Sequence, residues 1–109
     1  MITIGSDKDG LTDVSVDALM ALSHMELERI EITGKNSSDT KTSFIFKGDK
    51  VYIASGFAIG YSGSGPRGLH KIINVFYPEG ESDFNASIIP NLDYKTNWEW
   101  TKEKGFIRF

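Results

Sequence analysis

The chain has 109 residues, a length typical of one domain, and 39% of them are hydrophobic, enough to bury a compact core. Its formal net charge of −3 argues against a general binder of duplex nucleic acid, which usually presents a basic face. It contains no cysteine, which excludes disulfides, thiol nucleophiles and cysteine-rich zinc sites.

Cellular location is predicted from what the chain lacks. The first ten residues contain neither a basic start nor a long apolar run, so they do not have the pattern of a signal peptide. No apolar stretch approaches the ~20 residues that a membrane-spanning helix needs. Together with the absence of cysteine, these features predict a cytoplasmic protein that does not associate with membranes.

The N-terminal third predicts two strands and a helix. Residues 1–4 are β-like and predict a short edge strand. Ser15 is of a type that caps helices, and apolar residues at helical spacing after it predict a helix over 16–25. Polar and apolar residues then alternate, which predicts a strand over 27–33.

The middle of the chain predicts a β-hairpin. Residues 34–42 are polar and without periodicity, which predicts a mobile surface loop. Residues 42–46 and 51–61 then predict two strands joined by a turn at 47–50. A Ser-Gly pair at 55–56 marks a bulge or a bend within the second strand.

A second helix is predicted from about Arg67. Leu69, Ile72, Ile73 and Phe76 follow the spacing of one helical face, which predicts two to three turns. The helix is expected to stop within 77–80, where a proline and a glycine occur.

The last third predicts three further strands. Residues 84–89 predict one strand, ended by Pro90, and residues 98–100 and 106–109 predict a C-terminal hairpin. The fold class is therefore α+β. We expect a single small domain over 1–109, with a mainly antiparallel sheet of about five to six strands and about two helices.

A glycine-rich segment, Gly60–Leu69, is the strongest functional signal. Because it precedes the second helix, expected to start near Arg67, its backbone N–H groups and the positive helix end can surround an anion. The Arg67 guanidinium can hold two oxygens, and the Tyr61 ring can stack on a base. The predicted ligand-binding residues are Tyr61, Ser62, Gly63, Ser64, Gly65, Arg67, Gly68 and His70.

The segment matches known phosphate loops poorly. It lacks the lysine and the following hydroxyl of the nucleotide-hydrolase loop. Gly63, Gly65 and Gly68 satisfy the spacing of the dinucleotide-binding loop, but no βαβ unit is predicted around them. The alternative is a strand-to-helix turn whose glycines serve the backbone shape alone, and both interpretations stay open here.

Other groups of polar residues give no catalytic or metal site. The N-terminal aspartates, Asp7 to Asp17, lack the spacing of a calcium loop and predict a solvated acidic turn. His24 and His70 lack a second ligand at metal-binding spacing. No serine lies in a nucleophile elbow. We therefore predict no cofactor, no metal and no catalytic residue, and we favour a binding protein over an enzyme.

Two further surfaces are candidates for a protein partner. Trp98 and Trp100 point to the same face of the predicted hairpin, where they belong to the core or form an exposed binding surface. Glu26, Glu28 and Glu31 contribute to an acidic first half, which solubilises the protein or contacts a basic partner.

Two functions follow from these features. The leading hypothesis is non-enzymatic binding or sequestration of a phosphate-bearing, nucleotide-like small molecule through Gly60–Leu69. The alternative is an inhibitor or immunity protein that occludes a partner through its acidic or aromatic face. The edge strands of the sheet are also compatible with a homodimer.

Overall fold

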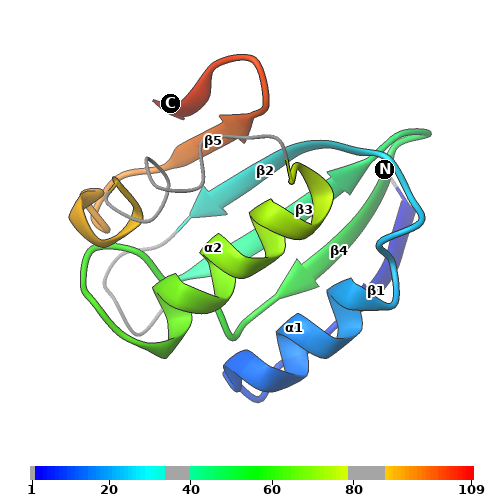
Figure 1. The fold of residues 1–109 in the computed structure, drawn as a ribbon, viewed down its shortest axis with the longest axis horizontal. Coiled ribbons are helices and arrows are strands. Elements are labelled where there is room, and N and C mark those ends of the chain that lie inside the picture. The colour runs from blue at the N-terminus through cyan, green and yellow to red at the C-terminus, as the bar shows by residue number, and fades with distance from the viewer. Residues whose placement is uncertain (1, 34–39, 79–87) are drawn as a thin grey trace.

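The computed structural model describes residues 2–33, 40–78 and 88–109. They form one six-stranded sheet and two α-helices, which confirms the α+β prediction (Figure 1). In chain order the elements are β1 (Ile2–Ser6), α1 (Thr12–Met20), β2 (Leu27–Thr33), β3 (Lys41–Phe46), β4 (Lys50–Ala54), α2 (Ser64–Phe76), the 3-10 helix η1 (Ile89–Asn91), β5 (Trp98–Thr101) and β6 (Gly105–Arg108).

The strands are ordered β1-β4-β3-β2-β5-β6, so β1 and β6 are the edges of the sheet. Among these described strands only β1 and β4 pair in parallel, and the other neighbours pair antiparallel, as predicted. Both helices cover the same face of the sheet, with α1 beside the β1 edge (Figure 1). The parallel pair places the carboxyl ends of β1 and β4 next to the N-termini of both helices (Figure 1).

The core lies between the sheet and the two helices. Strand alternation points Ile30, Ile32 and Phe44 toward the helices, and all three side chains are buried. Helix α2 contributes Leu69 and Ile72 from the face that its spacing predicted. The other fully buried large side chains are Leu19, Ile45, Phe46, Phe57, Ile59, Ile73 and Ile89.

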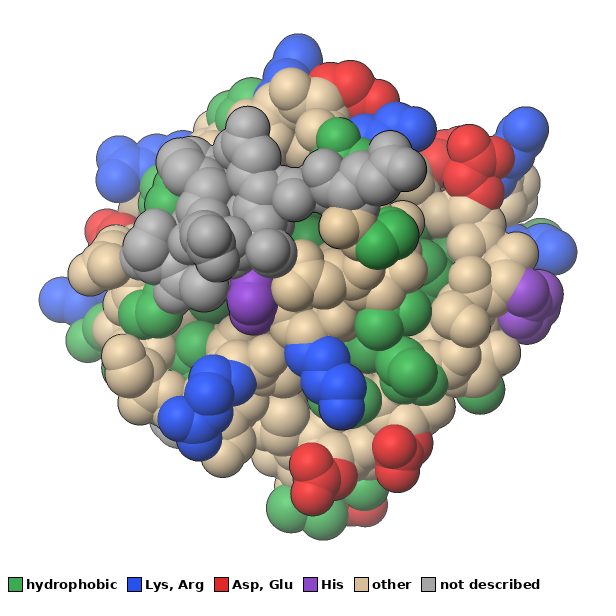
Figure 2. Space-filling view, viewed as in Figure 1, with side chains coloured by type: hydrophobic (Ala, Val, Ile, Leu, Met, Phe, Trp, Pro, Cys, Tyr) green, Lys and Arg blue, Asp and Glu red, His purple; other side chains and the backbone are tan. Residues whose placement is uncertain are grey.

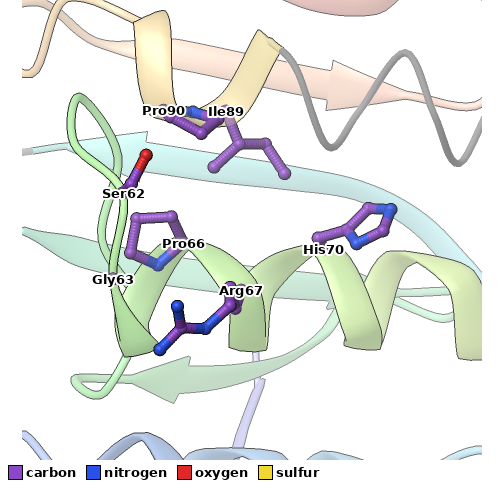
Figure 3. A pocket seen from close by; sticks show the side chains of 7 residues that line it. All are labelled: Ser62, Gly63, Pro66, Arg67, His70, Ile89 and Pro90. Carbon is purple, nitrogen blue, oxygen red and sulfur yellow. The ribbon is translucent and has the colours of Figure 1, made fainter.

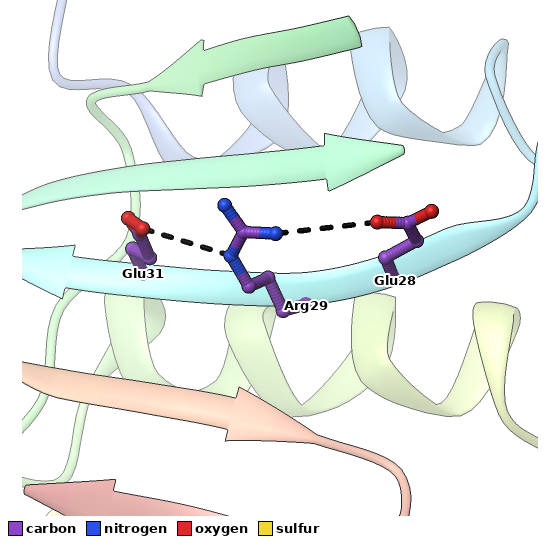
Figure 4. Close-up of polar contacts among 3 residues, drawn as sticks. All are labelled: Glu28, Arg29 and Glu31. Atoms are coloured by element: carbon purple, nitrogen blue, oxygen red, sulfur yellow. Dashed lines mark ion pairs between the residues drawn. The ribbon is translucent and has the colours of Figure 1, made fainter. Parts of the chain in front are cut away.

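The opposite face of the sheet carries an ion-paired patch. Arg29 lies on β2 between Glu28 and Glu31, and its guanidinium is 3.7 Å from a Glu31 oxygen and 4.0 Å from a Glu28 oxygen (Figure 4). In register with Arg29, Ile45 of β3 is buried, and so is its neighbour Val51 on β4. A second, smaller apolar strip therefore lies on this face of the sheet.

The structure confirms most predicted elements and moves several boundaries. Strand β2 has the predicted bounds, β3 and β4 form the predicted hairpin, and the C-terminal hairpin is present. The predicted bounds of the first helix are wrong by more than a turn, because the helix begins at Thr12 and ends at Met20. Ser15 does not cap it but lies inside it, fully buried. A short polar residue can satisfy a buried network as well as a helix end, which the local pattern does not distinguish.

Two predicted strands are also wrong in part. The strand expected over 51–61 ends at Ala54, because the chain bends at residues 55–56, and Phe57–Ile59 are buried without strand pairing. Of the strand expected over 84–89, residues 84–87 lie outside the described residues. Ile88 is helical and Ile89 is the first residue of η1, because Pro90 suits the first turn of a helix.

The polar segment predicted as a loop is shorter than expected. Residues 34–39 lie outside the described residues. Thr40 is buried, and Lys41 and Thr42 belong to β3. Among the helices of the described residues, none combines the length and the apolar character needed to cross a bilayer.

Candidate functional site

Helix α2 begins at Ser64, three residues earlier than predicted. Gly65 and Gly68 therefore lie inside the helix and not in the loop before it. Gly68 is in the second turn, where its N–H belongs to the helical ladder. The expectation that the Gly68 amide faces an anion is therefore wrong.

Close packing explains the glycine at position 68. A Cβ there would lie 2.4 Å from Cγ2 of Thr12 and 3.1 Å from Cε1 of Phe57. Only a residue without a side chain lets the start of α1 approach α2 this closely. Gly60 has a positive φ of 86°, a conformation that favours glycine. For these two positions the structure supports the backbone-shape interpretation.

The first turn of α2 leaves backbone donors for an anion. Gly63 occupies the cap position without a side-chain hydrogen bond, and the first turn contains no acidic residue. The N–H groups of Ser64 and Gly65 have no carbonyl four residues earlier within the helix to accept them. Arg67 is the first residue whose N–H is used, donating to the Gly63 carbonyl at 3.1 Å.

A pocket of about 250 Å³ opens beside this helix start (Figure 3). Arg67 and His70 line it from α2, and Figure 3 shows the Arg67 side chain reaching back toward the start of the helix. The loop before α2 is fixed to η1, because the Gly60 N–H donates to the Ile89 carbonyl at 3.1 Å. Ser62, Gly63, Pro66, Ile89 and Pro90 complete the lining.

Arg67 also lines a second cavity of about 230 Å³ between the two helices, together with Ser64 and Lys71. Ser64 and Arg67 therefore border one space. Asp13 of α1 forms part of the other wall. Figure 2 shows the charges of this face, with basic side chains over α2 and acidic side chains over α1.

Tyr61 does not share a pocket with Arg67. It lines a third cavity of about 340 Å³ with Ser64 and Gly65, at the end of β4. Its ring folds back over the loop, since a Cβ on Gly63 would lie 2.7 Å from the ring. The structure therefore groups Ser62, Gly63, Arg67 and His70, and it places Tyr61 on the other side of the helix start.

The predicted aromatic surface is largely internal. Trp100 is 3% exposed and packs in the core, so the interpretation of Trp100 as an exposed anchor is wrong and the core alternative is confirmed for it. Trp98 is half-buried, its indole N–H donates to the Asp93 carbonyl at 2.9 Å, and Arg108 covers its ring. Both rings point toward the helix side of the hairpin, where apolar neighbours cover them.

The predicted solvated acidic turn is wrong for Asp7, which is the centre of a hydrogen-bond network. Tyr52 donates its hydroxyl to the Asp7 carboxylate at 2.9 Å, and Ser15 donates at 3.0 Å. Ser55 donates both its N–H, at 3.0 Å, and its hydroxyl. The buried Ser15 hydroxyl in turn accepts the Gly56 N–H at 3.0 Å. The network ties the end of β1 to α1 and to the end of β4.

The network shifts the pKa values of both ionisable members. Partial burial alone would raise the pKa of Asp7, but the hydrogen bonds from Ser55, Tyr52 and Ser15 outweigh it and hold this pKa below 3.8. Burial, the hydrogen bond to Asp7 and the negative charge of Asp7 raise the pKa of Tyr52 to about 12. Tyr52 therefore remains a proton donor to Asp7 at neutral pH.

Sequence reasoning missed this network, because its members come from segments up to 48 positions apart. It also missed Ile89 and Pro90 as a pocket wall.

Among the residues that the structure describes, no group of three or more His, Asp or Glu side chains is arranged to hold a metal ion. Comparison of the chain with protein-family models, with curated proteins and with solved structures gave no match.

Proposed function

We propose that this protein binds a small phosphate-bearing molecule at the start of α2. The observation that carries the proposal is the combination of an uncapped helix N-terminus with an arginine that lines two cavities beside it. An anion placed there accepts a hydrogen bond from the Ser64 amide and is favoured by the helix dipole. The Arg67 guanidinium adds charge-assisted hydrogen bonds to the same oxygens.

The shape of the pocket suggests the remainder of the ligand. Pro66, Ile89 and Pro90 give one wall an apolar character suited to a ring, and His70 offers a polar group at the far end. Its volume of about 250 Å³ is near the lower limit for small-molecule sites. We therefore favour a nucleotide or a smaller phosphate ester as the ligand.

The structure offers less support for an inhibitor or immunity protein. Trp100, one of the two tryptophans of the predicted aromatic face, is buried in the core and is not exposed to a partner. In the acidic first half, Glu28 and Glu31 lie beside Arg29, and a Glu26 oxygen is 3.6 Å from the Lys47 ammonium. Cations therefore offset part of the negative potential that would attract a basic partner.

Replacement of Arg67 by alanine is expected to weaken binding of the phosphate ligand about tenfold, because one or two charge-assisted hydrogen bonds are lost. Calorimetric titration with inorganic phosphate and a panel of nucleotides, linear and cyclic, would identify the ligand and measure the change. Arg67→Lys should bind with intermediate affinity, since it keeps the charge but not the forked geometry.

Lys102→Ala is a matched control, because it removes one positive charge from the remote β5–β6 turn. It should leave the affinity unchanged, whereas a general electrostatic effect would weaken binding in both variants. The proposal fails if no phosphate compound in the panel binds, or if Arg67→Ala binds as tightly as the natural protein.

A further inference from the structure

The cavity of about 340 Å³ at the end of β4, called here the hydroxyl cavity, differs in its lining from the two cavities beside Arg67. Ten of the described residues line it, none of them is charged, and five carry a hydroxyl group. These five are Thr12, Thr40, Ser55, Tyr61 and Ser64. The other five are three glycines, an alanine and a phenylalanine. The cavity therefore combines a polar wall with the absence of charge among its lining residues.

The hydroxyl cavity lies at the carboxyl ends of the parallel strands β1 and β4, where both helices begin (Figure 1). Ser55 directly follows β4, and Thr12 and Ser64 are the first residues of α1 and α2. Ligands of open α/β sheets generally bind in the crevice outside the carboxyl ends of parallel strands. The topology therefore places this cavity where a ligand is expected.

The hydroxyl cavity also adjoins the proposed anion site. Thr12 and Ser64 line both this cavity and the cavity between the two helices. In the latter, Arg67 and Lys71 outnumber the single acidic residue, Asp13. A group esterified to a phosphate at the start of α2 can therefore extend directly into the hydroxyl cavity.

Internal hydrogen bonds fix one part of the cavity wall. The Ser55 hydroxyl donates to the Asp7 carboxylate and accepts the Gly10 N–H at 3.0 Å. The Thr12 hydroxyl donates to the Gly56 carbonyl at 2.7 Å. These bonds hold the two hydroxyl groups in place before any ligand enters, so the wall is preorganised.

Two other hydroxyl groups are available to a ligand. The Tyr61 side chain is 42% exposed, and its oxygen would lie 3.3 Å from a Cβ on Gly65, so the hydroxyl reaches the first turn of α2. Ser64 is exposed as well. Within the described part of the chain, neither the Tyr61 nor the Ser64 hydroxyl forms a hydrogen bond. Each can therefore both donate to a ligand and accept from it.

The lining of the cavity favours a neutral group with several hydroxyls. An apolar group would leave the wall hydroxyls without water or another partner. An anion would meet no lysine or arginine in this lining, and the Asp7 carboxylate lies directly behind Ser55. A cation would face the positive ends of both helices. We propose that the hydroxyl cavity binds a sugar esterified to the phosphate at the start of α2, an inference that rests on the proposed function.

Calorimetric titration with phosphate esters tests the sugar. Glucose 1-phosphate and ribose 5-phosphate are compared with phenyl phosphate, a monoester of the same charge type whose ring carries no hydroxyl. At least one sugar phosphate should bind about fivefold more tightly than phenyl phosphate, the gain expected from one additional hydrogen bond. ADP-glucose and UDP-glucose are compared with ADP and UDP in the same way. Tighter binding of a sugar nucleotide than of its parent nucleotide would also support the proposal and would identify a nucleotide as the source of the phosphate.

Tyr61→Phe tests the position of the sugar, because it removes only the hydroxyl group from the cavity wall. It should weaken binding of the sugar phosphate about fivefold and leave the affinity for inorganic phosphate unchanged. Tyr77→Phe is the matched control, since it removes the same group from a half-buried tyrosine at the other end of α2. It should change neither affinity. Equal effects of Tyr61→Phe on the sugar phosphate and on inorganic phosphate would overturn the assignment of this cavity to the sugar.

The titrations separate this inference from the proposed function. If inorganic phosphate and its esters bind but no sugar increases the affinity, the sugar assignment is overturned and the anion site stands. If neither inorganic phosphate nor any of the esters binds, the anion site is overturned, and the sugar assignment with it.

Discussion

Asp7→Ala is expected to lower the free energy of unfolding by about 3 kcal/mol, which chemical denaturation would measure. The carboxylate accepts hydrogen bonds from Ser15, Tyr52 and Ser55, and the alanine would leave these donors without their acceptor. The largest cost comes from Ser15, which is fully buried and cannot turn to water. The loss should therefore exceed that of an ordinary surface aspartate.

Asp7→Asn separates charge from shape in this network. It keeps one acceptor oxygen in nearly the same volume, so it should destabilise the protein by only about half as much. Asp9→Ala is a second control, because Asp9 is an exposed aspartate two positions away and outside the network. It should change the free energy of unfolding by less than about 0.5 kcal/mol. Equal losses for Asp7→Ala and Asp9→Ala would show that the network contributes nothing to stability.

The same network predicts how stability depends on pH. Since the pKa of Asp7 in the folded protein is lower than 3.8, the unfolded chain takes up a proton first as the pH falls. The contribution of the charged carboxylate is therefore complete well above pH 3.8 and is lost as the pH falls through the folded pKa. The stability difference between the natural protein and Asp7→Asn should be constant at neutral pH and should shrink below pH 3.8. A difference that grows in acid would contradict this assignment.

Gly68→Ala is expected to destabilise the protein by about 2 kcal/mol, although the same change in an exposed helix usually stabilises by about 1 kcal/mol. The new methyl group would lie 2.4 Å from Cγ2 of Thr12, so α1 and α2 would have to separate. Chemical denaturation of the variant would give the sign and size of the effect. An increase in stability would show that the helices do not approach as closely as the structure has them.

A second substitution tests the cause directly. Thr12→Ser removes the methyl group that a Cβ at position 68 would meet, and it keeps the hydroxyl that donates to the Gly56 carbonyl at 2.7 Å. In the Gly68→Ala background it should recover about half of the lost stability, and alone it should cost less than about 1 kcal/mol. The 3.1 Å approach to Phe57 explains why recovery is incomplete.

The sequence alone determined those elements whose pattern is local. Alternation in 27–33 predicted β2 with its observed bounds, and two strand-like segments around a Gly-Asp turn predicted the β3–β4 hairpin. The spacing of Leu69, Ile72 and Ile73 predicted the buried face of α2. In each case the signal and the structure involve the same few neighbouring residues, so the periodicity of the chain carries enough information.

Tertiary structure decided the features that depend on distant partners. Ser15 has the properties of a helix cap, but it becomes a buried member of the Asp7 network once β1 pairs with β4. In the sequence, Gly68 belongs to the glycine-rich segment that predicts a loop. In the structure it lies inside α2, where the close approach of Thr12 requires a residue without a side chain. The same holds for the candidate site, since the sequence supplied Arg67 and His70 while folding added Ile89 and Pro90 as the facing wall. Such contacts join residues tens of positions apart, and local propensity contains no information about which of them will meet.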